Sequence, residues 1–274
     1  MNASPQRQPS LFIPHGGGPC FFMDWTWGPA DTWEMTKRFL EGLAGTLPER
    51  PRALVVVSGH WEEPAFTVSS AERPPLIFDY YGFPKHTYEL TWPAPGDPVL
   101  AQQVKSLLAN AGLPAAESAA RGFDHGVFVP LKVAFPAADI PVVTLSLAAG
   151  SAGQLDAAQH LAAGRALAPL REEGVLIVGS GMSFHNLGAY MRAGTRQQAR
   201  EFDAWLTRAA ESPEPKRGDL LKQWAQAPHA KFAHPREEHL IPLMVAAGAG
   251  SEAAGKRIFS DEPMDAAISA YRFD

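Results

Sequence analysis

The stretch Ala53-Leu-Val-Val-Val-Ser-Gly-His60 decides the fold that this sequence predicts. Its residues from Leu54 to Val57 form an apolar, largely β-branched run, which is typical of a strand buried on both faces of a parallel sheet. A histidine follows this run after Ser58 and Gly59. Ligands of an open α/β sheet bind outside the carboxyl ends of its strands, so we expect His60 at such a binding edge.

Two further histidines repeat this arrangement. His15 follows the run from Leu11 to Pro14, and His185 follows the run Val175 to Val178 after a short loop. Because the carboxyl ends of parallel strands meet at one edge of the sheet, the three imidazoles can converge. Neutral imidazole is the commonest metal ligand, and a catalytic metal keeps an open coordination position. The pattern therefore predicts a mononuclear metal site.

Strand-like and helix-like segments alternate along the chain. This alternation predicts an α/β fold, with one three-layer domain in which helices flank a mostly parallel central sheet. The domain is expected over 10–274, after a flexible leader over 1–9. The expected strands are 10–14, 54–57, 66–70, 140–147, 175–178, 257–259 and 268–273, and the expected helices are 31–46, 99–111, 155–173, 195–210, 218–227 and 235–247.

The composition excludes several classes of protein. Hydrophobic residues make up 46% and charged residues 19%, and the net charge of −5 is spread without a basic patch for nucleic acid or an anionic membrane. A single cysteine, Cys20, allows neither an intramolecular disulfide nor a cysteine-based zinc site. No apolar run is long enough for a membrane span or a signal peptide, so we expect a cytoplasmic, soluble protein. The oligomeric state is left open.

Two histidines compete for a role near the C-terminus. A helix is expected to begin at Pro235, with a kink at Pro242. His234 then lies at the helix entrance as a cap, whereas His239 lies one turn inside, about 140° away around the helix axis. Beside two glutamates, His239 is the better candidate for a metal ligand.

The other polar candidates have ordinary interpretations as well. His160 is expected on the surface of an alanine-rich helix, and His229 in solvent at a helix terminus. His86 belongs to a loop over 74–98 whose proline, glycine and aromatic content predicts the wall or lid of a pocket. Asp124 either orients the imidazole of His125 or caps a turn, and the sequence leaves both open.

The motifs, in this order, resemble those of the DODA-type (LigB-like) class III extradiol ring-opening dioxygenases. Each motif is short, but six occur in register from residue 10 to about 247. The matching residues are Pro14-His-Gly-Gly-Gly-Pro19, Ser58-Gly-His-Trp61, Gly82-Phe-Pro84 with Pro93-Ala-Pro-Gly96, Gly122-Phe-Asp-His-Gly126, Gly179-Ser-Gly181 with His185-Asn-Leu187, and Pro235 through Glu238-His-Leu240 with Pro242-Leu243.

The resemblance implies a metal held by His15, His60 and His239, with Fe(II) in the working enzyme and Zn(II) often bound in the isolated protein. It implies that His185 is the acid/base group, and leaves open whether His185 is also a fourth ligand. It further implies that His125 lines the pocket and steers dioxygen or substrate.

The sequence departs from the family pattern at two positions. Related class III enzymes use a carboxylate as third ligand, whereas this chain has His239 at the expected position and Glu238 beside it. An all-histidine site suits zinc as well as iron. Trp92 stands where a tyrosine is expected, so the lid is expected to favour a different ring.

The expected function is that of a metal-dependent extradiol dioxygenase, which opens the ring of a DOPA-like or related catechol with O2. A small aromatic diol and O2 are therefore the expected partners. Two alternatives stay open: a zinc-dependent hydrolase or amidase with a metal-bound water as nucleophile, and a non-catalytic metal-binding relative. The sequence leaves the substituents of the catechol and the metal in the cell undetermined.

Overall fold

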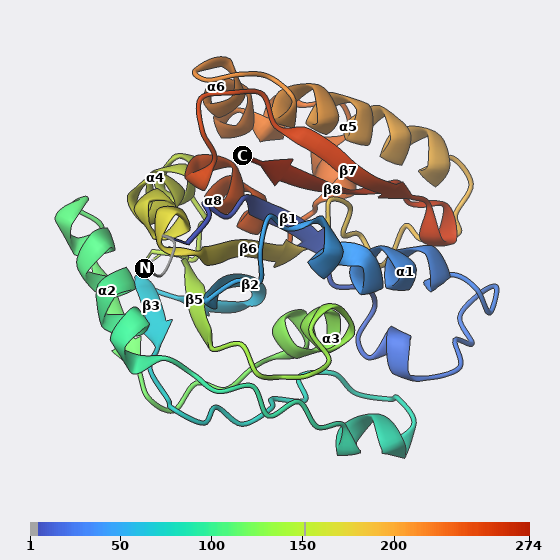
Figure 1. Cartoon of the computed structure of the whole chain (residues 1–274). Helices are drawn as coiled ribbons and strands as arrows, with labels where there is room; N and C mark the ends of the chain where they lie inside the picture. The colour runs from blue at the N-terminus through green and yellow to red at the C-terminus, as the bar shows by residue number, and fades with distance from the viewer. Residues whose placement is uncertain (1–4, 151) are drawn as a thin grey trace.

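The computed structural model describes residues 5–150 and 152–274, and an eight-stranded sheet forms its centre (Figure 1). The spatial order of the strands is β4-β3-β5-β2-β6-β1-β8-β7. Their bounds are β1 Ser10–Pro14, β2 Ala53–Glu63, β3 Phe66–Ser69, β4 Ala115–Ser118, β5 Val142–Ala148, β6 Val175–Gly181, β7 Lys256–Asp261 and β8 Ile268–Phe273.

The sheet is mostly parallel, as the sequence predicts. The four inner strands β5, β2, β6 and β1 run parallel to one another, and so do β3 and β4. β3 is antiparallel to β5, β8 is antiparallel to β1, and β7 forms an antiparallel hairpin with β8. The side chains from Val55 to Val57 on β2 are fully buried, because helices cover both faces of this inner strand.

Helices form a layer on each face of the sheet (Figure 1). α3 packs on β2 and β6 from one side, and α1 packs beside α3. On the other side α8 packs on β1, β2 and β6, while α2, α4, α5, α6 and α7 extend that layer. The bounds are α1 Glu34–Leu43, α2 Pro98–Asn110, α3 His125–Ala134, α4 Ala157–Leu167, α5 Thr195–Ala210, α6 Lys216–Lys222, α7 Ala230–Ala233 and α8 Pro242–Ala249. The prediction of a three-layer α/β domain is confirmed.

Short 3-10 helices connect or extend several of these elements. They are η1 Cys20–Phe22, η2 Ala44–Thr46, η3 Lys85–Glu89, η4 Ala168–Glu173, η5 Trp224–Gln226 and η6 Pro263–Asp265. η2 continues α1 to Thr46, and η4 continues α4 to Glu173. Each of the expected helices 31–46 and 155–173 therefore consists of an α-helix followed by a 3-10 helix. The edge strand β4 was not expected, since its residues are mostly exposed and carry no apolar pattern.

The prediction of the last helix was wrong in two respects: the residue at which the helix begins, and the kink expected at Pro242. Residues 235–241 form turns, and the helix α8 begins only at Pro242. Proline suits the first turn of a helix, where its missing N–H would have no partner in any case. Pro242 therefore starts this helix instead of kinking it, and His239 lies on the turn that leads into it.

Two other boundaries in the structure differ from the expected ones, the end of β2 and the start of the packed chain. β2 does not end at Val57 but continues to Glu63 after a register shift against β5, so His60 lies within the strand. At the N-terminus, residues 1–4 of the expected leader lie outside the described residues. Gln8 and Pro9 are buried, and the Gln8 N–H donates to the Arg171 carbonyl at 3.0 Å. The packed chain thus begins before the expected boundary at Ser10. No helix in the described part of the chain is long and apolar enough to cross a membrane.

Candidate metal centre

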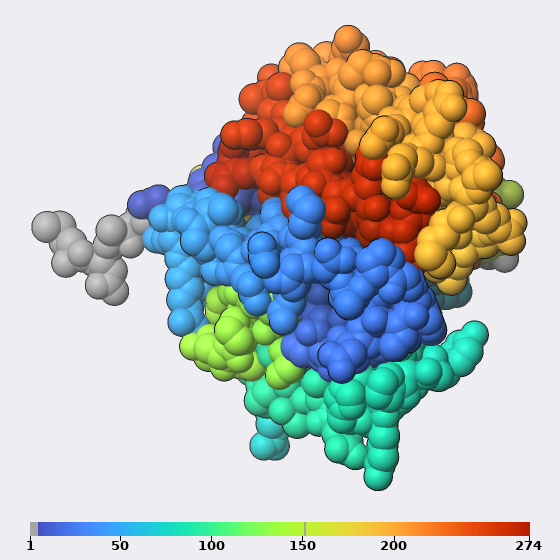
Figure 2. All heavy atoms as spheres, turned by 90° about the vertical axis from the view of Figure 1, so that its right-hand side faces the viewer, coloured from blue at the N-terminus to red at the C-terminus, as the bar shows by residue number. Residues whose placement is uncertain are grey.

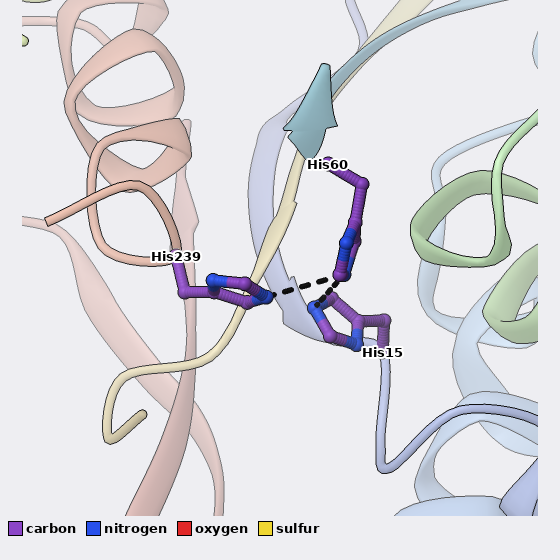
Figure 3. A group of neighbouring side chains, drawn as sticks. All are labelled: His15, His60 and His239. Carbon is purple, nitrogen blue, oxygen red and sulfur yellow. Dashed lines mark hydrogen bonds between the residues drawn. The ribbon is translucent and has the colours of Figure 1, made fainter. Parts of the chain in front are cut away.

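Three histidines from distant parts of the chain point their ring nitrogens at one another (Figure 3). The Nε2 atom of His60 lies 3.3 Å from Nε2 of His15 and 3.1 Å from Nε2 of His239. His15 and His239 are 2% and 4% exposed, and His60 is half-buried. The structure therefore brings together the three residues that the resemblance implies as metal ligands.

Backbone contacts at the strand ends hold two of these histidines. The His15 N–H donates to the Gly181 carbonyl at 3.2 Å, which extends the pairing of β1 with β6 by one residue. The Met182 N–H donates to the His239 carbonyl at 2.9 Å. A Cβ atom on Gly181 would lie 2.1 Å from that carbonyl oxygen, so only glycine lets the turn with His239 approach β6 this closely.

The outer nitrogen of each ring faces an oxygen atom. Nδ1 of His15 lies 2.8 Å from the Gly16 carbonyl, and Nδ1 of His239 lies 2.9 Å from Oε1 of Glu238. Nδ1 of His60 lies 3.5 Å from Oδ2 of Asp79. These oxygens can only accept, so the proton of each neutral ring belongs on Nδ1 and the Nε2 lone pairs face inward.

This geometry fits a metal ion. Three lone pairs that face one another at 3.1–3.3 Å repel unless a cation lies between them. Nitrogen ligands at 2.0–2.1 Å from one tetrahedral ion lie about 3.3 Å apart, close to the observed separations. The donor set is three neutral imidazoles, which suits zinc, iron and other borderline metals.

Burial keeps the three rings neutral and so able to bind a metal. Burial lowers the pKa of His15, His60 and His239 well below the ordinary value. The neighbouring imidazoles lower it further, because each would repel a second positive charge. A metal ligand must be deprotonated, so no proton needs to leave these rings near neutral pH.

His185 lies beside this group, and together with Glu238 and His239 it forms a second cluster that could hold a metal ion. Its ring stacks on that of His239, with the centroids 3.5 Å apart and the planes at 14°. Its Nδ1 atom lies 3.5 Å from Oε1 of Glu238, so the same carboxylate faces both His185 and His239. Burial opposes the ionisation of Glu238, but the hydrogen bond of His185 and the nearby cations outweigh it and lower the pKa of the carboxyl.

His125 packs on another ligand histidine and is oriented by an unexpected partner. Its ring centroid is 3.9 Å from that of His60. Oδ1 of Asp79 accepts from the backbone N–H of His125 at 2.9 Å and from its Nδ1 at 2.8 Å. Burial opposes the ionisation of Asp79, but these bonds to His125 outweigh it and lower the pKa of Asp79 to about 2. Asp79 is therefore a carboxylate that fixes the His125 ring.

Asp124 takes neither of the two roles that the sequence left open, because its side chain neither binds the His125 ring nor caps the following helix. The buried Asp124 side chain accepts from Ser58 Oγ at 2.7 Å and from the Arg121 guanidinium at 2.5 Å. It makes no side-chain capping bond to α3, although it occupies the N-cap position. Burial raises the pKa of Asp124, while Arg121 and Ser58 act in the opposite direction. Asp124 thus joins β2 to the start of α3 beneath the site.

The five histidines line one cavity of about 580 Å³. Its other walls are mainly aromatic, with Trp25, Trp27 and Trp33 on one side and Tyr80 and Phe83 on another. Figure 2 shows the face on which these segments meet: the blue N-terminal segment lies between the teal segment near residue 85 and the red and orange C-terminal segments. The expected aromatic loop is therefore one wall of the cavity.

Three other residues lie elsewhere than the sequence suggested. His160 is fully buried, not on the surface, because α4 packs between α2, α6 and α8. His234 is also fully buried and does not cap a helix; its Nε2 donates to the Ser183 carbonyl at 3.0 Å. Trp92 is buried outside the cavity lining and donates to the Phe135 carbonyl at 3.0 Å, so it does not contact the pocket.

The two exposed histidines, His229 and His86, lie closer to their predicted positions. His229 is partly exposed beside α7 and pairs with Glu201 at 2.7 Å. His86 is exposed, and its Nε2 lies 3.0 Å from the Phe22 carbonyl, outside the cavity lining. The sequence interpretation missed Asp79 and the three tryptophans near residue 30. The three tryptophans between residues 25 and 33, a short distance after the glycines that follow His15, were the available signal for this wall of the cavity.

The fold and the site together define a class of protein. It is an α/β protein with a three-histidine centre at the carboxyl edge of its parallel strands, at the base of an aromatic cavity. The family described as "Catalytic LigB subunit of aromatic ring-opening dioxygenase" matches residues 10–273. The chain therefore belongs to the LigB family, the class III extradiol dioxygenases, as the motifs predicted.

Individual relatives agree with this assignment. The chain is 39% identical to "Dioxygenase tasH" of Hapsidospora irregularis over 96% of this chain and 84% of that protein. It is 39% identical to "4,5-DOPA dioxygenase extradiol" of Portulaca grandiflora over 89% of this chain and 86% of that protein. The crystal structure of the uncharacterized protein JW3007 from Escherichia coli K12 matches with a TM-score of 0.78 and 29% identity, over 98% of this chain and 100% of that chain.

Proposed function

We propose that this protein cleaves the ring of a catechol-type substrate next to the diol, with O2, at an Fe(II) ion held by His15, His60 and His239. The observation that carries the proposal is the convergence of three Nε2 atoms at 3.1–3.3 Å at the base of the aromatic cavity. Zn(II) would occupy the same ligands in protein isolated without added iron. A bound Fe(II) ion supplies the redox chemistry that lets a catechol and O2 react despite their different spin states.

In this proposal His185 is the acid/base group. Its Nδ1 side faces Glu238, which leaves Nε2 for a catechol hydroxyl. An imidazole takes a proton and returns it readily near neutral pH. His185 would thus accept a catechol proton at Nε2 and later donate it during ring opening, while Glu238 stabilises the protonated ring.

His125 and the aromatic wall position the reactants. Asp79 fixes Nδ1 of His125 as a donor, so its Nε2 is free to accept from, or when protonated donate to, substrate or dioxygen in the cavity. Tyr80 packs edge-on to His125, with the ring centroids 5.8 Å apart. Such aromatic faces exclude water and contact a planar substrate ring.

One observation favours a second candidate, a zinc hydrolase or amidase. All three converging ligands are histidines, and the nearby carboxylates of Glu238 and Asp79 face imidazole nitrogens. Three histidines with an open fourth position also form catalytic zinc sites, in which a bound water becomes the nucleophile. The family assignment favours the dioxygenase.

The deciding experiment measures oxygen consumption by protein loaded with Fe(II) under nitrogen and then mixed with air and a set of catechols. The dioxygenase should consume one O2 per catechol and form a yellow ring-opened semialdehyde, whereas the Zn(II)-loaded protein should not. Oxygen uptake that stays at background in protein shown to contain iron would contradict the proposal. Ester or amide hydrolysis by the Zn(II) form would then support the hydrolase, and metal binding without any turnover would support a non-catalytic relative.

A further inference from the structure

Exposed hydrophobic side chains gather at the mouth of the histidine cavity. Among the described residues six large hydrophobic side chains are strongly exposed, and four of them line this cavity: Trp27, Tyr81, Leu187 and Met191. Their exposed fractions range from 54% to 91%. We call these four residues the apolar rim. Apolar side chains that cluster in this way mark a binding surface, because scattered ones are the norm.

No acidic side chain, lysine or arginine belongs to the described lining of the cavity, which comprises nineteen residues. The charged groups nearest to the histidines are already paired: Asp79 binds His125, Glu238 binds His239, and Arg121 binds Asp124. A charged substituent on a substrate would therefore find no counter-ion in the described lining.

We propose that the preferred substrate is a catechol with an uncharged, apolar substituent that packs on the apolar rim, and not a zwitterionic catechol amino acid. This inference rests on the proposed catechol cleavage and narrows it to one substrate class. In this proposal the diol faces the five histidines at the cavity base, and the substituent faces the apolar rim.

Two physical effects favour the neutral substituent. A carboxylate that leaves water without a partner is strongly disfavoured, and the aromatic faces of Trp27 and Tyr81 present negative potential that repels an anion. An ammonium group would be attracted by these faces, so a catechol with a cationic substituent should bind better than one with an anionic substituent. Each methylene buried against the rim favours binding by about fourfold.

The test compares catechols that differ in the charge of a short side chain: 4-propylcatechol is neutral, dopamine cationic, dihydrocaffeate anionic and L-DOPA zwitterionic. Binding is measured under nitrogen with the full chain through quenching of tryptophan fluorescence, since Trp25, Trp27 and Trp33 line the cavity. Turnover is measured in air with the Fe(II)-loaded chain. We expect 4-propylcatechol to have a kcat/KM at least about tenfold above that of dihydrocaffeate, with dopamine between them.

Matched variants test the role of the rim. Met191 and Met35 are both 56% exposed, but only Met191 lines the cavity. Met191→Arg should improve dihydrocaffeate relative to 4-propylcatechol by about threefold, as expected of an exposed ion pair. Met35→Arg adds the same charge on α1 and should leave the ratio unchanged, and Met191→Gln separates charge from loss of apolar surface.

The outcomes distinguish this inference from the proposed function. Turnover that favours L-DOPA or dihydrocaffeate over 4-propylcatechol overturns the inference and leaves catechol cleavage intact. Tight quenching by 4-propylcatechol with weak quenching by dihydrocaffeate, but without oxygen uptake in iron-loaded protein, supports the apolar cavity and overturns the dioxygenase. Equal shifts in the ratio from Met191→Arg and Met35→Arg overturn the role of the rim.

Discussion

Two groups of buried histidines differ in what their ring nitrogens face. In the candidate metal centre the Nε2 atoms of His15, His60 and His239 face one another. His160 and His234, in the helical layer, direct ring nitrogens at backbone groups instead. The comparison teaches that burial alone does not identify a ligand. A nitrogen aimed at other nitrogens, with its ring fixed by an acceptor on the opposite side, is the distinguishing feature.

His160 shows the structural role most clearly. Its Nδ1 donates to the Asp156 carbonyl at 2.7 Å, and its Nε2 accepts from the Ala148 N–H at 3.2 Å. Its ring packs edge-on to Phe66 with the centroids 5.1 Å apart. Both nitrogens are satisfied, so this histidine ties α4 to the end of β5 and has no lone pair left for a metal.

The most severe test of the comparison removes one histidine from each group. His239→Ala should abolish stoichiometric metal binding and oxygen uptake, because two imidazoles hold an ion far more weakly than three. His160→Ala should keep one metal per chain and lose about 1–3 kcal/mol of unfolding free energy through its broken hydrogen bonds. Elemental analysis and urea denaturation of both variants check this. A His239→Ala protein that retains one tightly bound metal would refute the assigned ligand set.

A second test concerns His185, which belongs to neither group. Its ring stacks on His239, yet it is not among the three converging nitrogens. His185→Ala should lower kcat by about 10²–10⁴-fold, the usual contribution of a general acid/base, with the metal content unchanged. His229→Ala, which removes a partly exposed histidine paired with Glu201, is the control and should keep wild-type turnover. Full turnover without His185 would exclude the acid/base role, and loss of the metal would make His185 a ligand.

The third test addresses the carboxylate behind the rings. Asp79→Asn keeps the shape of the side chain but removes the charge that holds His125 and faces His60. Substitution of a carboxylate that faces a ligating histidine typically lowers metal affinity or activity by about 10–100-fold. Asp203→Asn serves as the control, since Asp203 is also a carboxylate that holds neighbouring side chains, but it binds Ser269 and Arg257 outside the cavity lining. The Asp79 variant should lose activity and the Asp203 variant stability; equal activities would show that Asp79 is only structural.

The sequence predicts the parts of this site that depend on strand ends. His15 directly follows a buried strand, and His185 lies a few residues beyond another, so the parallel sheet alone places them at one edge. The periodic apolar pattern likewise predicts α5 over its exact bounds, Thr195–Ala210. Local patterns thus sufficed wherever a single strand or helix determined the position of a residue.

Contacts between distant segments account for what the sequence could not predict. Asp79 reaches His125 across 46 residues from a loop without regular pattern. The position of His239 depends on its close approach to Gly181 and not on a helical phase. His160 looked exposed because an alanine-rich helix has no marked polar face, and only its packing between α2, α6 and α8 buries it.

The smallest expected effect is the pH dependence of stability that comes from the buried structural histidine His160. Burial lowers the pKa of His160 to about 4, from an ordinary value of 6.5. The unfolded chain therefore binds more protons between these values, so unfolding becomes easier as the pH falls from 6.5 toward 4. Between pH 7 and pH 5 this group alone should remove about 2 kcal/mol of unfolding free energy.

His160→Asn removes this titration while keeping a donor near the position of Nδ1. The variant should be less stable than the wild type at pH 7, yet its stability should fall less steeply toward pH 5, and urea denaturation at both values measures the difference. All other titratable groups are the same in both proteins, so their contribution cancels in the comparison. Parallel pH profiles would mean that His160 accepts a proton in the folded state, and its assignment as a neutral structural histidine would then be wrong.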